Sequence, residues 1–302
     1  MTPAPETPQV AYLSHVTAPD GRTTTDVYRH TIRLAVTAES LGFDTIWFAQ
    51  HHFGAKHSRL PAPLPLLAAI AQHTTTIKLG TAAITASLEH PTRLAEDAAV
   101  VDELSGGRLQ LGLGAGSDVT ASQHFGTDHE QRHEHARHTT TTMLDTLCGT
   151  ELTPHTPDLA DRVWFASSSP SGAEFAARYR IGLISGRKSP DPAAVHEADA
   201  QAADTIRTYR TAIDVSPRVA VSRPVMPGID STELTERQRS TTYCGPASTV
   251  LERLQQDPEL AVADEVICHS QPLALPPDRE LDMLRRIAHD IAPALPTRSP
   301  AH

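Results

Sequence analysis

Hydrophobic positions in the first fifty residues change from a helical to a strand period. Apolar residues recur at steps of three and four across residues 26–41, which predicts an amphipathic helix, and Gly42 stands where a C-terminal cap is expected. The apolar run at residues 45–49 then predicts a short buried strand. His51 and His52 follow this strand, at the end where α/β folds place their chemistry.

The same alternation of strand and helix continues along the chain. Apolar segments predict eight strands, at residues 10–16, 45–49, 77–85, 108–114, 163–167, 181–185, 218–225 and 264–269. Amphipathic segments predict eight helices, at residues 26–41, 63–73, 91–104, 130–147, 171–179, 191–212, 246–256 and 278–291. Eight strands that each precede a helix predict an α/β fold, the (β/α)8 TIM barrel. A doubly wound open sheet is the alternative, but no GxGxxG motif follows the first strand.

Length and composition agree with a barrel. The 302 residues predict one domain, with flexible tails at residues 1–8 and 295–302. The net charge of −10, without a basic cluster, argues against a nucleic-acid partner, and no apolar run is long enough to span a membrane. Three cysteines without CxxC spacing, and no signal-peptide pattern, predict a reducing, cytoplasmic location.

The loops at the carboxyl ends of the strands are the expected site of a barrel. They are residues 15, 51–52, 85–91, 114–118, 167–171, 185–188, 222–224 and 269–271. These loops hold hydroxyls, histidines and backbone amides, a set that suits a phosphorylated ligand, and they lack the acidic cluster that a metal requires.

A second group of histidines invites a metal interpretation. It comprises His124, His129, His133, His135 and His138, of which His129 and His133 would share one helix face. No carboxylate or cysteine completes a ligand set at the strand ends, so we expect no metal, and we expect a solvated helix face or a wall of the substrate pocket instead.

Several segments, in order, resemble one family. The segment AESLGFDTIWFAQHHF, followed by IKLGTAAITASLEHPTRLAEDAAVVDELSGGRLQLGLGAG, is similar to the bacterial luciferase-like flavin-dependent monooxygenases. The resemblance is close over residues 10–177 and weaker over residues 245–269. The fold that it implies is a (β/α)8 barrel, in agreement with the strand count.

The resemblance implies roles near the flavin ring. His51 matches the histidine that family members use as a base or hydrogen-bond partner at the reactive edge of the flavin, and His52 shapes the pocket beside it. Gln50 stands where most members have glutamate, which puts any proton relay through that carboxylate in doubt. Ala82 and Ala83 match the segment beneath the ring, where the luciferases hold a non-proline cis peptide bond.

The resemblance also implies a phosphate site. Ser167, Ser168 and Ser171 match the strand-to-helix turn that holds the FMN phosphate, and free N–H groups at a helix start attract a dianion on physical grounds as well. Arg132 matches one family arginine, and Arg187 is a further candidate for the phosphate charge.

The function implied is that of an oxygenase. Family members use reduced FMN, supplied by a partner flavin reductase, and O₂ to oxygenate a small organic substrate through a peroxyflavin, and they are frequently homodimers. One alternative is an F420-dependent oxidoreductase of the same fold, which transfers hydride without oxygen. Another is a non-catalytic flavin-binding protein, suggested by Gln50 and by Ala115, which stands where the luciferases have an arginine.

Overall fold

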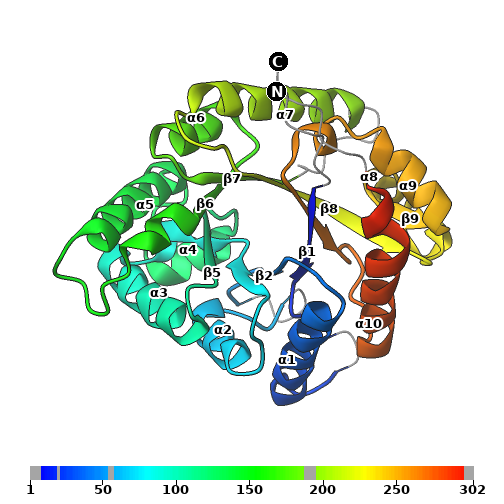
Figure 1. The fold of residues 1–302 in the computed structure, drawn as a ribbon, viewed down its shortest axis with the longest axis horizontal. Helices are drawn as coiled ribbons and strands as arrows, with labels where there is room; N and C mark the ends of the chain where they lie inside the picture. The colour runs from blue at the N-terminus through cyan, green and yellow to red at the C-terminus, as the bar shows by residue number, and fades with distance from the viewer. Residues whose placement is uncertain (1–7, 19–20, 54–57, 187–194, 296–302) are drawn as a thin grey trace.

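Eight parallel strands close into a barrel (Figure 1). The computed structural model describes residues 8–295 except 19–20, 54–57 and 187–194. The strands pair in the order β1-β2-β3-β5-β6-β7-β8-β10, and β10 pairs with β1 to complete the circle. Their bounds are β1 Gln9–Ser14, β2 Thr45–Phe48, β3 Lys78–Thr81, β5 Leu109–Gly114, β6 Val163–Ala166, β7 Gly182–Gly186, β8 Val219–Pro227 and β10 Glu265–His269. The predicted barrel is confirmed, and its eight strands lie close to the predicted positions in the sequence.

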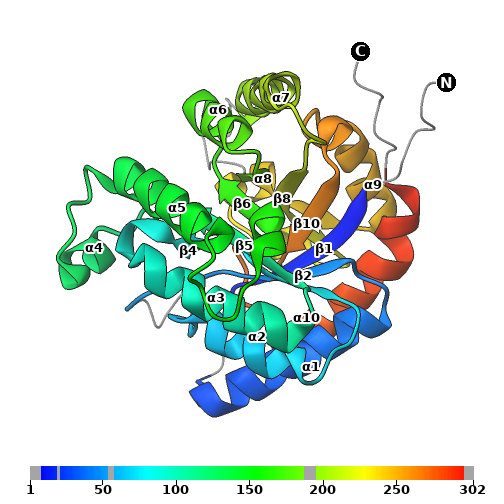
Figure 2. The ribbon, with the colours of Figure 1, turned by 60° about the vertical axis from the view of Figure 1, so that its left-hand side comes forward.

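Helices cover the outside of the barrel, as the two views show (Figures 1 and 2). The main ones are α1 Thr24–Ser40, α2 Pro63–Ala71, α3 Pro91–Ser105, α5 Arg132–Cys148, α6 Pro170–Arg178, α7 Val195–Ala212, α9 Ala247–Gln255 and α10 Pro277–Arg286. Each corresponds to a predicted helix. Pro91 occupies the first turn of α3, and Gly106 ends that helix in the left-handed conformation, with φ of 67°.

Three short elements were not predicted. They are the strand β9 Tyr243–Gly245 and the helices α4 Val119–Phe125 and α8 Glu236–Thr241. The predicted third strand, residues 77–85, is interrupted, so that β3 ends before Ala82 and β4 Ile84–Thr85 resumes on the same side of β5.

Two tryptophans fill the barrel interior. Trp47 on β2 and Trp164 on β6 meet edge to face, with ring centroids 5.7 Å apart. Glycines on the neighbouring strands make room for them, because a Cβ at Gly80 would lie 2.2 Å from the Trp47 ring and one at Gly182 would lie 2.3 Å from the Trp164 ring. The interior is therefore a packed core, and ligands must bind at its end.

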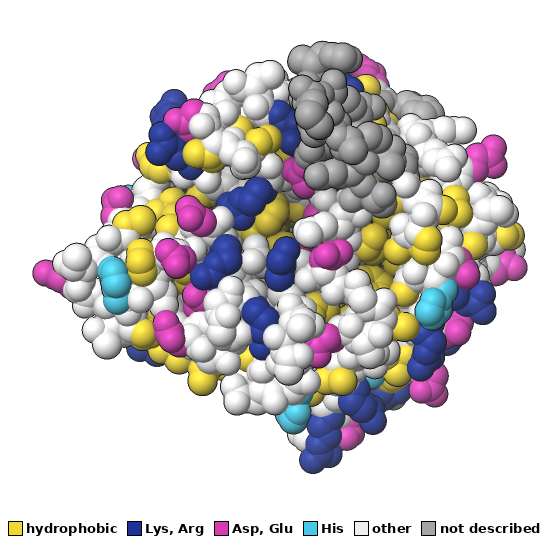
Figure 3. Space-filling model, viewed as in Figure 1, with side chains coloured by type: hydrophobic (Ala, Val, Ile, Leu, Met, Phe, Trp, Pro, Cys, Tyr) yellow, Lys and Arg dark blue, Asp and Glu magenta, His cyan; other side chains and the backbone are white. Residues whose placement is uncertain are grey.

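The two ends of the described chain are anchored. Pro8 and Leu295 lie inside the predicted tails but are buried, and the rest of both tails lies outside the described residues. No helix in the part of the chain that the structure describes is long and apolar enough to cross a membrane. Acidic and basic side chains are interspersed on the face drawn in Figure 3.

Candidate active site

A cavity of about 380 Å³ lies at the carboxyl ends of strands β1, β2, β4, β5 and β6, and we call it the first cavity. It brings together His15, His51, His52, Ala82 and Ala83, all of which the sequence nominated, with residues 85 and 114–118 of the expected loops. Its other lining residues are Ala49, Gln50, Ile84, Thr85, Gly114, Ala115, Gly116, Ser117, Asp118, Ala121, Ser122 and Ala166. Barrel enzymes carry their active sites at this end, so the first cavity is the candidate active site.

One wall of the first cavity consists of backbone and methyl groups. The Ala82–Ala83 peptide bond is cis, as predicted. A Cβ placed on Gly114 would lie 3.4 Å from the Ala83 methyl and 3.5 Å from the Ala166 methyl, so these three residues already lie side by side. Such a wall lets a planar ring approach the backbone closely.

Three histidine rings gather beside this wall. The His15 ring lies 6.1 Å from the His51 ring and 5.4 Å from the His269 ring, centroid to centroid. Burial, followed by the nearby His269 and His51, holds the pKa of His15 well below its usual range, and burial with the Arg223 charge lowers the pKa of His269 to about 3. His15 and His269 are therefore neutral at physiological pH, and they offer hydrogen bonds without charge.

His52 lies at the rim of the first cavity. Burial lowers its pKa, while the carboxylates of Glu89 and Asp118 raise it. Its ring packs against Phe125 of α4 at 4.8 Å. The unpredicted helix α4 thus forms part of the cavity mouth.

Gln50 joins three segments of the cavity wall. Its amide nitrogen donates to the Pro61 carbonyl at 3.0 Å and to the Glu89 carboxylate at 3.2 Å, and its oxygen accepts from the Thr85 N–H at 2.7 Å. A glutamate at this position could accept from Thr85 but could not donate when ionised, and it would repel Glu89. The amide is therefore the side chain that this arrangement requires, with the carboxylate located at Glu89.

The serine turn between β6 and α6 is held mainly by its own hydrogen bonds. Ser169 is the N-cap of α6, and its hydroxyl shares a hydrogen bond with that of Ser167 at 3.0 Å. Ser168 donates to the Gly186 carbonyl and lines a different cavity, which also contains Glu259. Ser171 lines a third cavity, apart from that of Ser168, although both serines lie at the start of α6.

The arginine beside this turn is Arg137, which sequence reasoning missed. Its guanidinium donates to the Ser171 hydroxyl at 3.0 Å and lies over the Phe175 ring. Arg132 is the first residue of α5 and donates instead to the His129 carbonyl. Arg187 lies outside the described residues. The signal for Arg137 was its place one and a half turns into a helix that packs near α6, which could be used only once the helix start was known.

The histidines of α4 and α5 do not gather around a common point. His129 shares a hydrogen bond with the Ser122 hydroxyl at 3.1 Å, and the His124 ring packs on Phe53. Within residues 8–295, excluding the undescribed segments, no group of three or more His, Cys, Asp or Glu side chains is placed to hold a metal ion.

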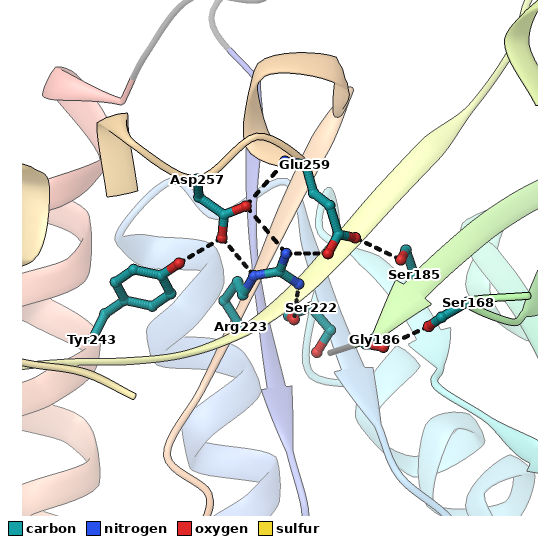
Figure 4. A network of polar contacts seen from close by, with 8 residues as sticks. All are labelled: Ser168, Ser185, Gly186, Ser222, Arg223, Tyr243, Asp257 and Glu259. Atoms are coloured by element: carbon teal, nitrogen blue, oxygen red, sulfur yellow. Dashed lines mark hydrogen bonds and ion pairs between the residues drawn. The ribbon is translucent and has the colours of Figure 1, made fainter. Parts of the chain in front are cut away.

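A buried network of charged and polar side chains connects β7 and β8 (Figure 4). Arg223 on β8 is fully buried and pairs with Asp257 and Glu259, both of which are also buried. Tyr243 donates to Asp257, and Ser185 of β7 donates to Glu259 at 2.7 Å. Burial raises the pKa of Glu259, while Arg223 and Ser185 lower it. The network joins β7, β8 and the 3₁₀ turn Leu260–Val262, and nothing in the sequence pattern indicated it.

Sequence comparison finds relatives among monooxygenases. The alkanal monooxygenase alpha chain of Photorhabdus laumondii is 35% identical over 104 residues, which are 34% of this chain and 29% of the relative. The chain spans between 29% and 50% of the length of the first curated relatives that it matches.

Structure comparison finds the same barrel in two cofactor classes. The oxygenating constituent of 3,6-diketocamphane monooxygenase from Pseudomonas putida, in complex with FMN, has a TM-score of 0.76 at 18% identity and covers 97% of this chain and 100% of its own. The coenzyme F420-dependent tetrahydromethanopterin reductase of Methanopyrus kandleri has a TM-score of 0.70 at 15% identity and covers 96% and 100%. At these identities the likeness establishes the fold. The profile of the luciferase-like monooxygenases matches residues 9–288, so the chain belongs to that family.

Proposed function

We propose that the chain is a monooxygenase that uses reduced FMN and O₂ to oxygenate a small organic molecule, with the flavin ring in the first cavity. The observation that carries the proposal is the wall of backbone and methyl groups at Ala82, Ala83 and Gly114, in the same cavity as His51 and His52. Family membership and the FMN complex of a protein with the same fold support it.

The residues present fit a flavin ring. Two residues that line the first cavity each have a buried ring nitrogen, Nδ1 of His15 and Nε2 of His52, without a hydrogen-bond partner within the described structure. Buried polar atoms are normally paired, so the two nitrogens favour a polar ligand at this cavity. The oxygens and nitrogens of a flavin ring on the Ala82–Ala83 wall are suitable partners.

Each side chain then has a defined task. Bound reduced FMN supplies the electrons that activate O₂. His51 holds or moves a proton at the ring edge, and His15, kept neutral by its surroundings, supports His51 without adding charge. Helix α4 and His52 restrict water at the mouth of the cavity.

The phosphate is expected near the start of α6. Free backbone N–H groups at that helix start and the hydroxyls of Ser167, Ser168 and Ser171 supply donors. Arg137, which already contacts Ser171, is a better candidate for the positive charge than Arg132, and Arg187 stays a prediction. A partner flavin reductase and a homodimer also stay predictions.

The FMN assignment is tested by fluorescence titration. The fluorescence of FMN is expected to be quenched when FMN binds to the purified chain. A Gly114→Val variant, whose branched side chain projects toward Ala83 and Ala166, is expected to lose that binding. F420-dependent hydride transfer is the second candidate, because an F420-dependent reductase shares the fold. Tight binding of F420 with no binding of FMN would replace the first proposal by the second.

His51→Ala separates an enzyme from a flavin carrier. We expect its affinity for FMN to stay within about twofold, while turnover with reduced FMN and O₂ falls by about 10²-fold or more, as for loss of a general acid or base. His73→Ala, at an exposed histidine on the barrel exterior, is the matched control and should change neither quantity. Unchanged turnover in His51→Ala would remove His51 from the chemistry.

A further inference from the structure

A second cavity, of about 340 Å³, lies at the carboxyl ends of β7, β8 and β10. It is lined by Gly186, Ser222, Pro224, Arg237, Gln238, Thr241, His269, Gln271 and Pro272. The volume is at the small end of the range for pockets that bind small molecules, roughly 300 to 1,000 Å³. The proposed flavin chemistry does not use it.

Two histidines separate the second cavity from the first. His269 lines the second cavity, His15 lines the first, and their rings are 5.4 Å apart. Nδ1 of His269 is buried and has no hydrogen-bond partner among the residues that the structure describes. A molecule in the second cavity could therefore contact His269, whose ring packs against His15 of the first cavity.

The charge of the second cavity differs from that of the others. Three further cavities of the molecule each include at least one carboxylate among their lining residues, namely Asp118, then Glu134 and Glu174, then Asp199 and Glu259. Of the described residues that line the second cavity, none is acidic, and one, Arg237, carries a permanent positive charge. In a chain of net charge −10, the second cavity thus has a local charge that favours an anion.

Arg237 is available for such an anion. It lies on α8 and is exposed, and its guanidinium makes no hydrogen bond or ion pair within the described part of the molecule. Its neighbour Arg239, on the same short helix, donates to the Leu234 carbonyl and does not line the cavity. The amide of Gln271 and the rings of Pro224 and Pro272 line the same space, so the cavity combines one charged group with apolar surface.

We infer that the second cavity binds the organic substrate and that it selects a small molecule with an apolar body and one carboxylate. The carboxylate lies at Arg237, where a charge-assisted hydrogen bond is available, and the opposite end lies at His269, beside the flavin site. The inference rests on the proposed function only in identifying the bound molecule as the substrate. The preference for an anion follows from the lining residues themselves.

The test compares two probes of equal length, octanoate and octanamide, by isothermal titration calorimetry on the full chain. Octanoate is expected to bind about five- to tenfold more tightly than the uncharged octanamide. In Arg237→Gln this preference should disappear through weaker octanoate binding, whereas Arg239→Gln should retain it. The preference of the native chain should also decrease with added salt. Because Arg237 is exposed and its guanidinium makes no hydrogen bond or ion pair with the described residues, its substitution is not expected to unfold the protein, which circular dichroism checks.

Three results would overturn the inference: equal binding of the two probes, an unchanged preference in Arg237→Gln, or no binding of either probe. FMN titration of the same samples keeps the two proposals apart. If the native chain does not bind FMN but prefers octanoate, the monooxygenase proposal is contradicted and the inference about the second cavity is supported. FMN binding without any octanoate preference contradicts the anion cavity alone.

Discussion

The carboxyl of Glu265 is expected to make the stability of the protein fall as pH rises. Glu265 begins β10 and is 4% exposed, and its two oxygens accept from the Thr45 hydroxyl at 2.8 Å and from the Trp47 indole N–H at 2.7 Å. Burial raises the pKa of this carboxyl to about 7, from an ordinary value of 4.5, although both hydrogen bonds lower it.

The direction follows from proton binding. Between pH 4.5 and about pH 7 the folded protein holds a proton on Glu265 that the unfolded chain has released. The free energy of unfolding therefore decreases as pH rises through this window. At about 1.4 kcal/mol for each pH unit, the Glu265 contribution amounts to about 3 kcal/mol across the window and about 2.5 kcal/mol between pH 5 and pH 8.

Glu265→Gln removes the titration, because an amide stays neutral. Urea unfolding of both proteins at several pH values from about 5 to about 8 gives the difference in unfolding free energy, in which the contributions of all other groups cancel. We expect this difference to shift in favour of the variant by about 2.5 kcal/mol over that range. Glu252→Gln, at an exposed position on α9, is the matched control for the same chemical change without burial. A flat difference for Glu265→Gln would mean that Glu265 is ionised in the folded protein, and the reasoning from burial would fail.

Two further substitutions test the packing and the charge around the first cavity. Gly112→Ala places a Cβ 2.0 Å from the Thr81 carbonyl oxygen, so β3 and β5 must move apart. We expect the free energy of unfolding, measured with urea, to decrease by about 2 kcal/mol or more. An unchanged stability would refute the close approach. Gln50→Glu places a second carboxylate beside Glu89 and removes the donor to Pro61. We expect the melting temperature of the variant, relative to that of the native chain, to decrease as the pH is raised from about 5 to about 8. A difference that stays constant over this range would contradict the arrangement.

The barrel itself could be predicted because its signals are long and repeated. Strands buried on both faces are continuous apolar runs, and the helices between them have a clear period and local stops such as Gly106. Helix α8 could not be found in this way, since six residues with none buried have no hydrophobic period. The signal it does carry is a capping box, in which Thr235 and Gln238 bond reciprocally, and that pattern alone is too common to predict a helix.

The site was predictable where strand ends determine it and unpredictable where side chains reach across the fold. His51 and His52 follow β2 directly, so the topology places them at the cavity. Arg223 pairs with residues 34 and 36 positions away, through a turn whose path no local pattern specifies. Arg137 was missed for a related reason, because the direction of a helical side chain depends on where the helix begins.

The distribution of charge connects the two cavities. In the first cavity, Gln50 stands where a carboxylate was expected, and the pKa of His15 lies well below its usual range. Asp118, which lines the first cavity, would repel an anion, so a positive charge that selects an anionic substrate must come from elsewhere. Arg237 lies in the neighbouring cavity, beyond the His15–His269 contact, and is free to supply it. If the first cavity binds flavin, the octanoate preference therefore tests whether substrate selection and flavin chemistry take place in separate cavities.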